Sequence, residues 1–76
     1  MIRLKQRDLG RVVLICFWDH SQNCDHPIYC EAVGKLTWFT SHSIHIRPWD
    51  CPRDKDVDTE DYCILRAVVK SVSVLR

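Results

Sequence analysis

The chain has 76 residues, 46% of them hydrophobic, and its 11 basic and 10 acidic residues leave a formal net charge of +1. This length suits one small domain rather than two, and the composition excludes a disordered or fibrous protein. The near-zero charge argues against a protein that binds nucleic acid or membranes through overall charge, and no apolar run approaches the ~20 residues that cross a bilayer.

The cysteine content and the N-terminal residues indicate the cellular compartment in which the protein is expected to act. The five cysteines form an odd set with irregular spacing, which does not indicate a disulfide framework. Charged residues interrupt the first ten positions, so the apolar core of a secretory signal is missing. We therefore expect a cytoplasmic protein with reduced thiols and no membrane partner.

Residues 1–10 are expected to be a basic lead-in, followed by one domain over residues 11–76. Apolar residues alternate with charges in the lead-in, which predicts a short helical turn or a frayed segment that Gly10 ends. The basic side chains here are Arg3, Lys5, Arg7 and Arg11. We favour a solubilising role for them; the alternative is contact with phosphate or an acidic partner.

Two strands are predicted in the first half of the domain. Residues 11–18 are rich in β-branched, aromatic and leucine residues, and both faces are apolar, as in a strand through the centre of a small barrel. A buried helical segment is the alternative for this stretch. The polar residues 19–27 predict a loop, and residues 28–40 predict a longer strand in which Gly34 indicates a bulge or sharp bend.

A third strand follows a tight turn at residues 40–42. Residues 43–49 alternate between polar and apolar side chains, so Ile44 and Ile46 are expected to point to one face together. Pro48 lacks the backbone N–H that strand pairing requires, so we expect the pairing to end there or to mark an edge.

The remaining elements are short. Residues 50–60 predict a long charged loop, residues 61–66 a fourth strand, residues 67–69 a helical turn, and residues 70–75 a final strand with alternate valines inward. Five strands that end in a strand, a short turn and a strand predict an all-β fold, specifically a small five-stranded barrel of the SH3-like or Sm-like type.

At the level of pattern, the chain resembles small SH3-like and Sm-like barrel proteins of phage and bacterial genomes. The resemblance rests on Trp18-Asp19 at the end of the first strand, a glycine-centred segment at residues 31–36 and a closing segment at residues 64–69. It covers roughly residues 11–75, and it implies a fold but no specific activity. The cysteine and histidine content and the acidic loop depart from the pattern.

One cluster has the residue types of a zinc site. His20, Cys24, His26 and Cys30 follow one another with the spacing H-x3-C-x-H-x3-C, and thiolate with imidazole suits tetrahedral zinc. The spacing matches no standard zinc pattern. We expect a domain without a cofactor, in which these residues form a polar loop and a buried Cys30, and keep zinc as the alternative.

Thiol catalysis needs a cysteine beside a histidine and an orienting group. The sequence offers Cys24 with His26 and Asp25, or Cys51 with His45. No strand-to-helix elbow or glycine-rich oxyanion loop accompanies them. We therefore expect a protein that is not an enzyme.

The acidic segment raises the question of calcium. It contains Asp54, Asp56, Asp58, Glu60 and Asp61, in part with D-x-D-x-D spacing. The glycine and the terminal bidentate glutamate of a calcium loop are missing. A solvated loop is the favoured interpretation, with contact to a basic partner surface as the alternative.

In addition to aliphatic residues, the predicted core includes cysteines and aromatic residues. Cys16 and Cys63 fall in apolar strands, where a free thiol acts as a small hydrophobe. Each tryptophan is expected to favour the core, because small barrels depend on large aromatic side chains. Trp38 and Phe39 are adjacent, so in a strand they must face opposite ways and at least one is exposed.

The third strand and its flanks carry the candidate binding site. Aromatic rings beside cationic side chains are typical of stacking platforms for single-stranded nucleic acid. The residues are Trp38, Phe39, His42, His45, Arg47, Trp49 and Arg53.

Two functions follow as hypotheses. The favoured one is a non-enzymatic protein-binding or adaptor module, of the kind seen in small phage inhibitors or in Sm-like barrels that self-assemble through open strand edges. The alternative is a barrel that binds single-stranded nucleic acid, with zinc stabilisation compatible with either.

Overall fold

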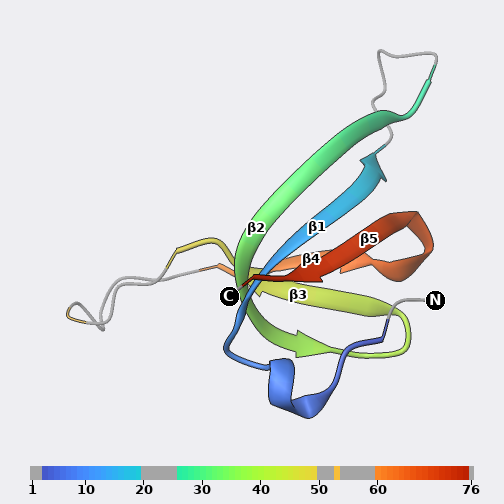
Figure 1. The fold of residues 1–76 in the computed structure, drawn as a ribbon. Helices are drawn as coiled ribbons and strands as arrows, with labels where there is room; N and C mark the ends of the chain where they lie inside the picture. Colours follow the sequence, from blue (N-terminus) through green and yellow to red (C-terminus); the bar gives the residue numbers. More distant parts are fainter. Residues whose placement is uncertain (1–2, 20–25, 50–52, 54–59, 76) are drawn as a thin grey trace.

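The computed structural model describes residues 3–19, 26–49, 53 and 60–75, which form one antiparallel sheet (Figure 1). The elements are η1 (Gln6–Asp8), β1 (Val12–Asp19), β2 (Ile28–Phe39), β3 (Ser43–Arg47), β4 (Tyr62–Leu65), η2 (Arg66–Val68) and β5 (Val69–Val74). The strand order is β4-β3-β2-β1-β5. The predicted all-β fold with five strands is confirmed. Among the described residues β4 and β5 remain edges, so pairing does not close the sheet.

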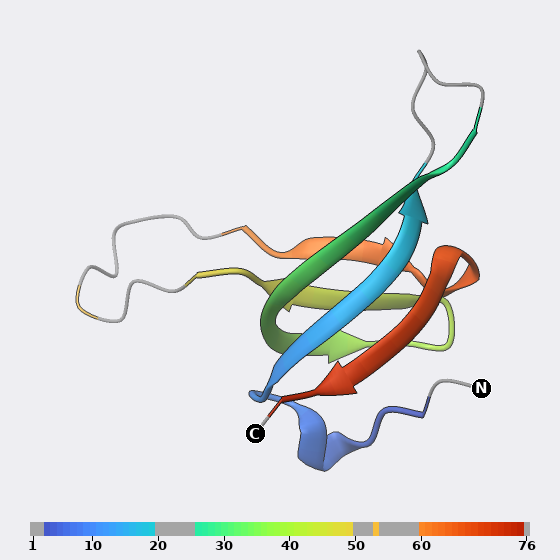
Figure 2. The same cartoon turned by 45° about the horizontal axis from the view of Figure 1, so that its top comes forward.

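Strand β2 joins the two halves of the sheet and curves strongly between them (Figures 1 and 2). Its first part pairs with β1 and its last part with β3, and Lys35 lies opposite both Val12 and Arg47. At Gly34 the two halves come close, because a Cβ there would lie 2.8 Å from the Arg47 carbonyl oxygen. The register shift lies between Leu36 and Trp38, not at Gly34. Of the two expected features, the bulge therefore does not lie at Gly34, whereas β2 does bend between its two halves (Figures 1 and 2). Gly34 allows the close approach of two backbone segments there.

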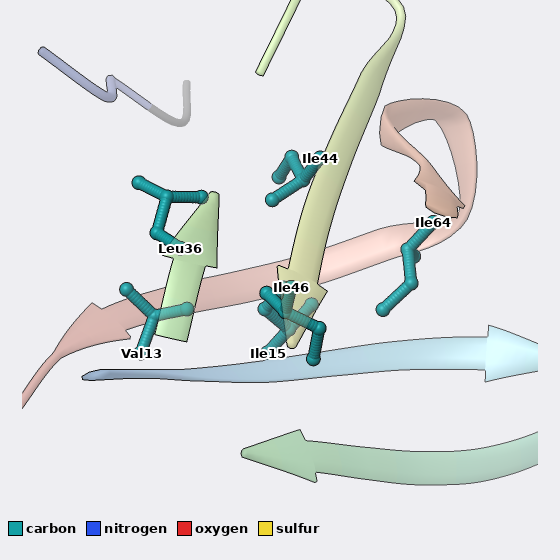
Figure 3. Close-up of a cluster of buried hydrophobic side chains, with 6 residues drawn as sticks. All are labelled: Val13, Ile15, Leu36, Ile44, Ile46 and Ile64. Carbon is teal, nitrogen blue, oxygen red and sulfur yellow. The ribbon is translucent and has the colours of Figure 1, made fainter. Parts of the chain in front are cut away.

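The core is aliphatic and draws on four strands. Figure 3 shows its six buried side chains converging between the two halves of the sheet; they are Val13, Ile15, Leu36, Ile44, Ile46 and Ile64. Each is at most 7% exposed. The predicted inward alternation of Ile44 and Ile46 is confirmed, since Ser43, His45 and Arg47 between and beside them are only half-buried.

Two expectations about the core are wrong. Trp18, Trp38 and Trp49 are 43%, 53% and 58% exposed, so none of them fills the core. Cys63 is exposed as well, whereas Cys16 is buried as expected. The physical reason is the two-residue period: Phe17 and Phe39 pack against the core, which turns the adjacent Trp18 and Trp38 outward.

The lead-in covers one end of the core. Gly10 has a φ of 85°, where a side chain is disfavoured, and its N–H donates to the Leu36 carbonyl at 2.8 Å. Leu4 and Leu9 are partly buried against the core.

The predicted helical turns are confirmed as η1 and η2. In the part of the chain that the structure describes, no helix is long and apolar enough to cross a bilayer.

Candidate functional site

The outer face of β1 and β2 presents a group of exposed apolar side chains. Directly opposite residues of paired strands lie on the same face, and the register pairs Leu14 with Val33 and Trp18 with Tyr29. Val13 and Ile15 enter the core, so the alternate residues of β1 face outward. We call this surface the outer patch; it comprises Val12, Leu14, Trp18, Tyr29 and Val33.

Most of the outer patch is open to solvent. Val33 is 50% and Val12 is 44% exposed, while Leu14 is half-buried between its neighbours. The rings of Trp18 and Tyr29 meet edge to face, with centroids 5.4 Å apart and an angle of 66° between their planes. The patch therefore has an aliphatic end and an aromatic end on two paired strands, with the Cys16–Glu31 pair between them.

Polar groups border the aromatic end of the outer patch. Lys70 of β5 places its Nζ 5.5 Å from the centroid of the Tyr29 ring, within the range of a cation–π contact. A hydrogen bond with the Cys16 side chain, followed by partial desolvation and the negative charges of Cys16 and Glu31, raises the pKa of Tyr29 to about 12. The phenol therefore stays neutral over the physiological range and keeps its proton for hydrogen bonding.

A shallow hollow of about 220 Å³ continues the outer patch toward the end of β3. Trp49 and Pro48 line it together with Val12 and Val33. Its lining is completed by Gly34, Lys35 and Arg47. The exposed Trp49 ring thereby extends the apolar surface beyond β1 and β2.

The residues of the predicted binding hairpin do not share one surface. Trp38 lies opposite His45 in the β2–β3 register, but Phe39 packs against the core and Trp49 lines the hollow described above. Arg47 Nε donates to Asp61 Oδ1 at 2.8 Å. His42 and Arg53 are exposed.

The Arg47–Asp61 pair belongs to a small polar network that sequence reasoning missed. Thr37, at the register shift of β2, donates its hydroxyl to Asp61 Oδ2 at 2.7 Å. The Thr37 and Arg47 hydrogen bonds, together with the positive charge of Arg47, hold the pKa of Asp61 below its usual value of 3.8. Asp61, one of the acids of the charged segment, is thus hydrogen-bonded to both β2 and β3.

A thiol and an imidazole meet on the outer face of β3 and β4. The register places His45 opposite Cys63, and the Cys63 Sγ lies 3.8 Å from His45 Nε2. The same Nε2 is 3.0 Å from the Ser43 hydroxyl. Sequence reasoning had weighed His45 with Cys51, which lies outside the described residues. Strand register was the missing information, because Cys63 is 18 residues away along the chain.

The proposed zinc ligands are described only in part. His20 and Cys24 lie outside the described residues, as do Asp25 and most of the acidic segment. His26 is exposed, and the half-buried Cys30 donates its thiol to the Ile28 carbonyl at 3.6 Å. Within the described ranges no three metal-binding side chains gather.

The outer patch is the feature that sequence reasoning missed most clearly. The apolar character of both faces of residues 11–18 was the available signal, because one face of that strand had to remain outside a small core. No protein family, curated protein or solved structure matches this chain.

Proposed function

We propose that the chain is a non-enzymatic protein-binding module that docks a partner on the outer patch. The observation that carries the proposal is the run of exposed apolar side chains on one face of β1 and β2, with two aromatic rings at one end. Exposed apolar side chains that gather on one face and are bordered by polar groups are a feature of interaction sites. Aromatic residues are enriched in the centres of protein interfaces.

A finer fold assignment belongs to the same proposal. We assign the sheet to the SH3-like or Sm-like type, supported by the order β4-β3-β2-β1-β5, the long curved β2 and the 3-10 turn η2 between β4 and β5. The two edges, β4 and β5, offer unpaired backbone groups for self-assembly or strand addition. We also propose a cytoplasmic location, supported by the odd and irregularly spaced set of cysteines.

The test compares two variants of the full chain. In the first, Trp18→Ser and Val33→Ser remove the apolar character of the outer patch. The second, Trp38→Ser, is the matched control, since Trp38 is at least as exposed but lies on the other half of the sheet. All three positions are near half exposed, so we expect each change to alter stability by roughly 0.5 kcal/mol or less.

Size-exclusion chromatography with light scattering and quantitative crosslinking to host proteins are the readouts. The proposal expects a defined assembly or partner that the double variant loses and that Trp38→Ser retains. It is refuted if the wild-type chain and the double variant show the same mass and the same crosslinked partners.

Single-stranded nucleic acid binding is the second candidate, favoured by the exposure of Trp38 and Trp49. Base stacking on such rings contributes roughly 1–3 kcal/mol per base. Against it, Arg47 is paired with Asp61. This candidate predicts fluorescence quenching by a single-stranded oligonucleotide at low salt, lost in Trp38→Ser and weakened by added salt. Unchanged fluorescence at low salt would exclude it.

Zinc binding by His20, Cys24, His26 and Cys30 is compatible with either function. It predicts stoichiometric zinc in the purified chain and a lower melting temperature after chelation. A chain that melts at the same temperature with and without a chelator, and that carries no zinc, would exclude it.

A further inference from the structure

We propose that Cys63 is a reactive thiol that forms mixed disulfides, with His45 as the group that takes and returns its proton. The proposal is independent of the outer patch. It rests on the contact between the two side chains across β3 and β4, with Sγ 3.8 Å from Nε2. A cysteine becomes a nucleophile as its thiolate, so a base within reach of the thiol proton is the feature that matters.

The polar neighbours of His45 orient the ring for this role. Ser43 Oγ lies 3.0 Å from Nε2 and 3.0 Å from Thr40 Oγ1. Thr40 Oγ1 already accepts the backbone N–H groups of His42 and Ser43. Its own hydroxyl proton is thus directed to Ser43, whose proton then points to His45. In that arrangement the imidazole proton sits on Nδ1 and Nε2 is an acceptor. Because Nε2 has a single lone pair, it takes the thiol proton when the Ser43 hydroxyl rotates away from it.

The other described cysteines have different surroundings. Cys16 is 8% exposed, and its thiol donates to the Glu31 carboxylate at 3.8 Å, so burial limits the access of a reagent to its sulfur. Cys30 is half-buried and donates to the Ile28 carbonyl. Among the described thiols, Cys63 alone combines exposure with a neighbouring base.

The surroundings of Cys63 also favour a particular class of reagent. Cys63 contributes to a hollow of about 290 Å³ whose other lining includes Phe17, Trp18, Leu65 and Val68. An aromatic disulfide can bind against the apolar side chains of this hollow, beside the strand that carries the thiol. We therefore assign small, apolar disulfides as the favoured co-reactants.

The reaction balances without a further oxidant. His45 Nε2 takes the Cys63 proton, and the thiolate attacks one sulfur of the disulfide R–S–S–R. A new bond joins Sγ to that sulfur, the original S–S bond breaks, and the released R–S⁻ takes the proton from the imidazolium to leave as R–SH. The thiol of Cys63 is oxidised and the second sulfur of the disulfide is reduced.

The test follows each cysteine separately in the reduced full chain. A dipyridyl disulfide is added near neutral pH, the reaction is stopped with acid, and peptide mass spectrometry gives the rate at each position. We expect Cys63 to react faster than Cys30 and much faster than Cys16. We expect His45→Gln to slow Cys63 by about tenfold, below the ~10²–10⁴-fold typical of general-base catalysis because the site is open to water.

Two controls separate activation from simple exposure. His42→Gln makes the same change at the histidine of the β2–β3 turn, and the Cys63 rate should stay as in the wild type. Cys16 reports folding, because unfolding of a variant would accelerate its reaction. Equal Cys63 rates in the wild type and in folded His45→Gln would overturn the proposal.

A second measurement needs no variant. Folding normally slows the reaction of a thiol by covering it, so an activated thiol should react faster in the folded chain than in the urea-unfolded chain. The rate of a small free thiol, measured with and without urea, corrects for the effect of urea on the reaction itself. We expect this inversion for Cys63 and the ordinary order for Cys16. A Cys63 rate in the folded chain at or below its rate in urea would also overturn the proposal.

Discussion

Replacing Gly34 by alanine tests whether the close approach of the two halves of the sheet requires a residue without a side chain. The added Cβ would lie 2.8 Å from the Arg47 carbonyl oxygen, 3.0 Å from its carbon and 3.2 Å from the Pro48 Cα. All three are backbone atoms, so rotation of a side chain cannot relieve the contact. The carbonyl must retreat by about 0.6 Å to reach the 3.4 Å at which ordinary contact begins.

The size of the effect follows from two opposing terms. Forcing an extra methyl group into a packed site costs roughly 1–3 kcal/mol. Removing glycine from a strand returns up to about 1 kcal/mol, because the unfolded chain loses freedom. The φ of Gly34 is not positive, so no backbone strain is added. We expect a net loss of about 1–2 kcal/mol, which lowers the melting temperature of a domain this size by roughly 5–15 °C.

Thermal unfolding followed by circular dichroism measures the shift. Gly10→Asn is the contrasting control: no atom lies within 4 Å of a Cβ at Gly10, and its φ of 85° is one that asparagine tolerates. We expect a small change there and a large loss for Gly34→Asn. If Gly34→Ala melts at or above the wild-type temperature, the close approach does not constrain this position.

Three further changes probe the core and the titrating groups. Ile46→Ala removes a side chain that is 1% exposed and should lower the free energy of unfolding by about 2–5 kcal/mol in urea titrations; a loss below 1 kcal/mol would contradict its place in the core. The lowered pKa of Asp61 contributes stability that is present above its unfolded value of 3.8 and is lost as the pH falls through the folded value. Asp61→Asn should therefore cost less than about 1 kcal/mol near neutral pH and nothing in strong acid, as urea midpoints at the two pH values will show. The raised pKa of Tyr29 has the opposite pH dependence: the stability that it contributes is complete below pH 10.0 and is lost as the pH rises through about 12. Subtracting the tyrosinate absorbance of Tyr29→Phe from that of the wild type isolates the Tyr29 titration, whose midpoint should lie near pH 12.

Local pattern predicted the elements well because each strand carries its own signal. Alternation placed Ile44 and Ile46 inward, and β3 ends at Arg47, directly before Pro48. The adjacency of Trp38 and Phe39 required opposite directions, and the structure has Trp38 exposed with Phe39 against the core. These predictions depend only on the two-residue period of a strand.

The same reasoning failed where it had to choose a face without knowing the size of the core. Six aliphatic side chains fill the space between the two halves of the sheet, so the tryptophans remain outside. Cys63 was assigned to the core on the apolar character of its segment, but β4 buries Ile64 alone in that strand. Burial depends on the total volume available, which no single segment specifies.

Predicting the candidate sites required knowledge of which strands pair, because the site residues lie far apart along the chain. The outer patch was within reach of the sequence, because residues 11–18 are apolar on both faces. The contacts of Asp61 with Thr37 and of Cys63 with His45 were not, since they join residues 24 and 18 positions apart.

The amino-acid sequence by itself determined that this protein is built of five strands, roughly where each lies along the chain, and which side chains alternate along them, because these follow from backbone preferences over a few residues. Only the tertiary structure decided which face each strand buries and which side chains meet across it. Those outcomes follow from register and from the limited volume of a small core, and both are properties of the assembled sheet.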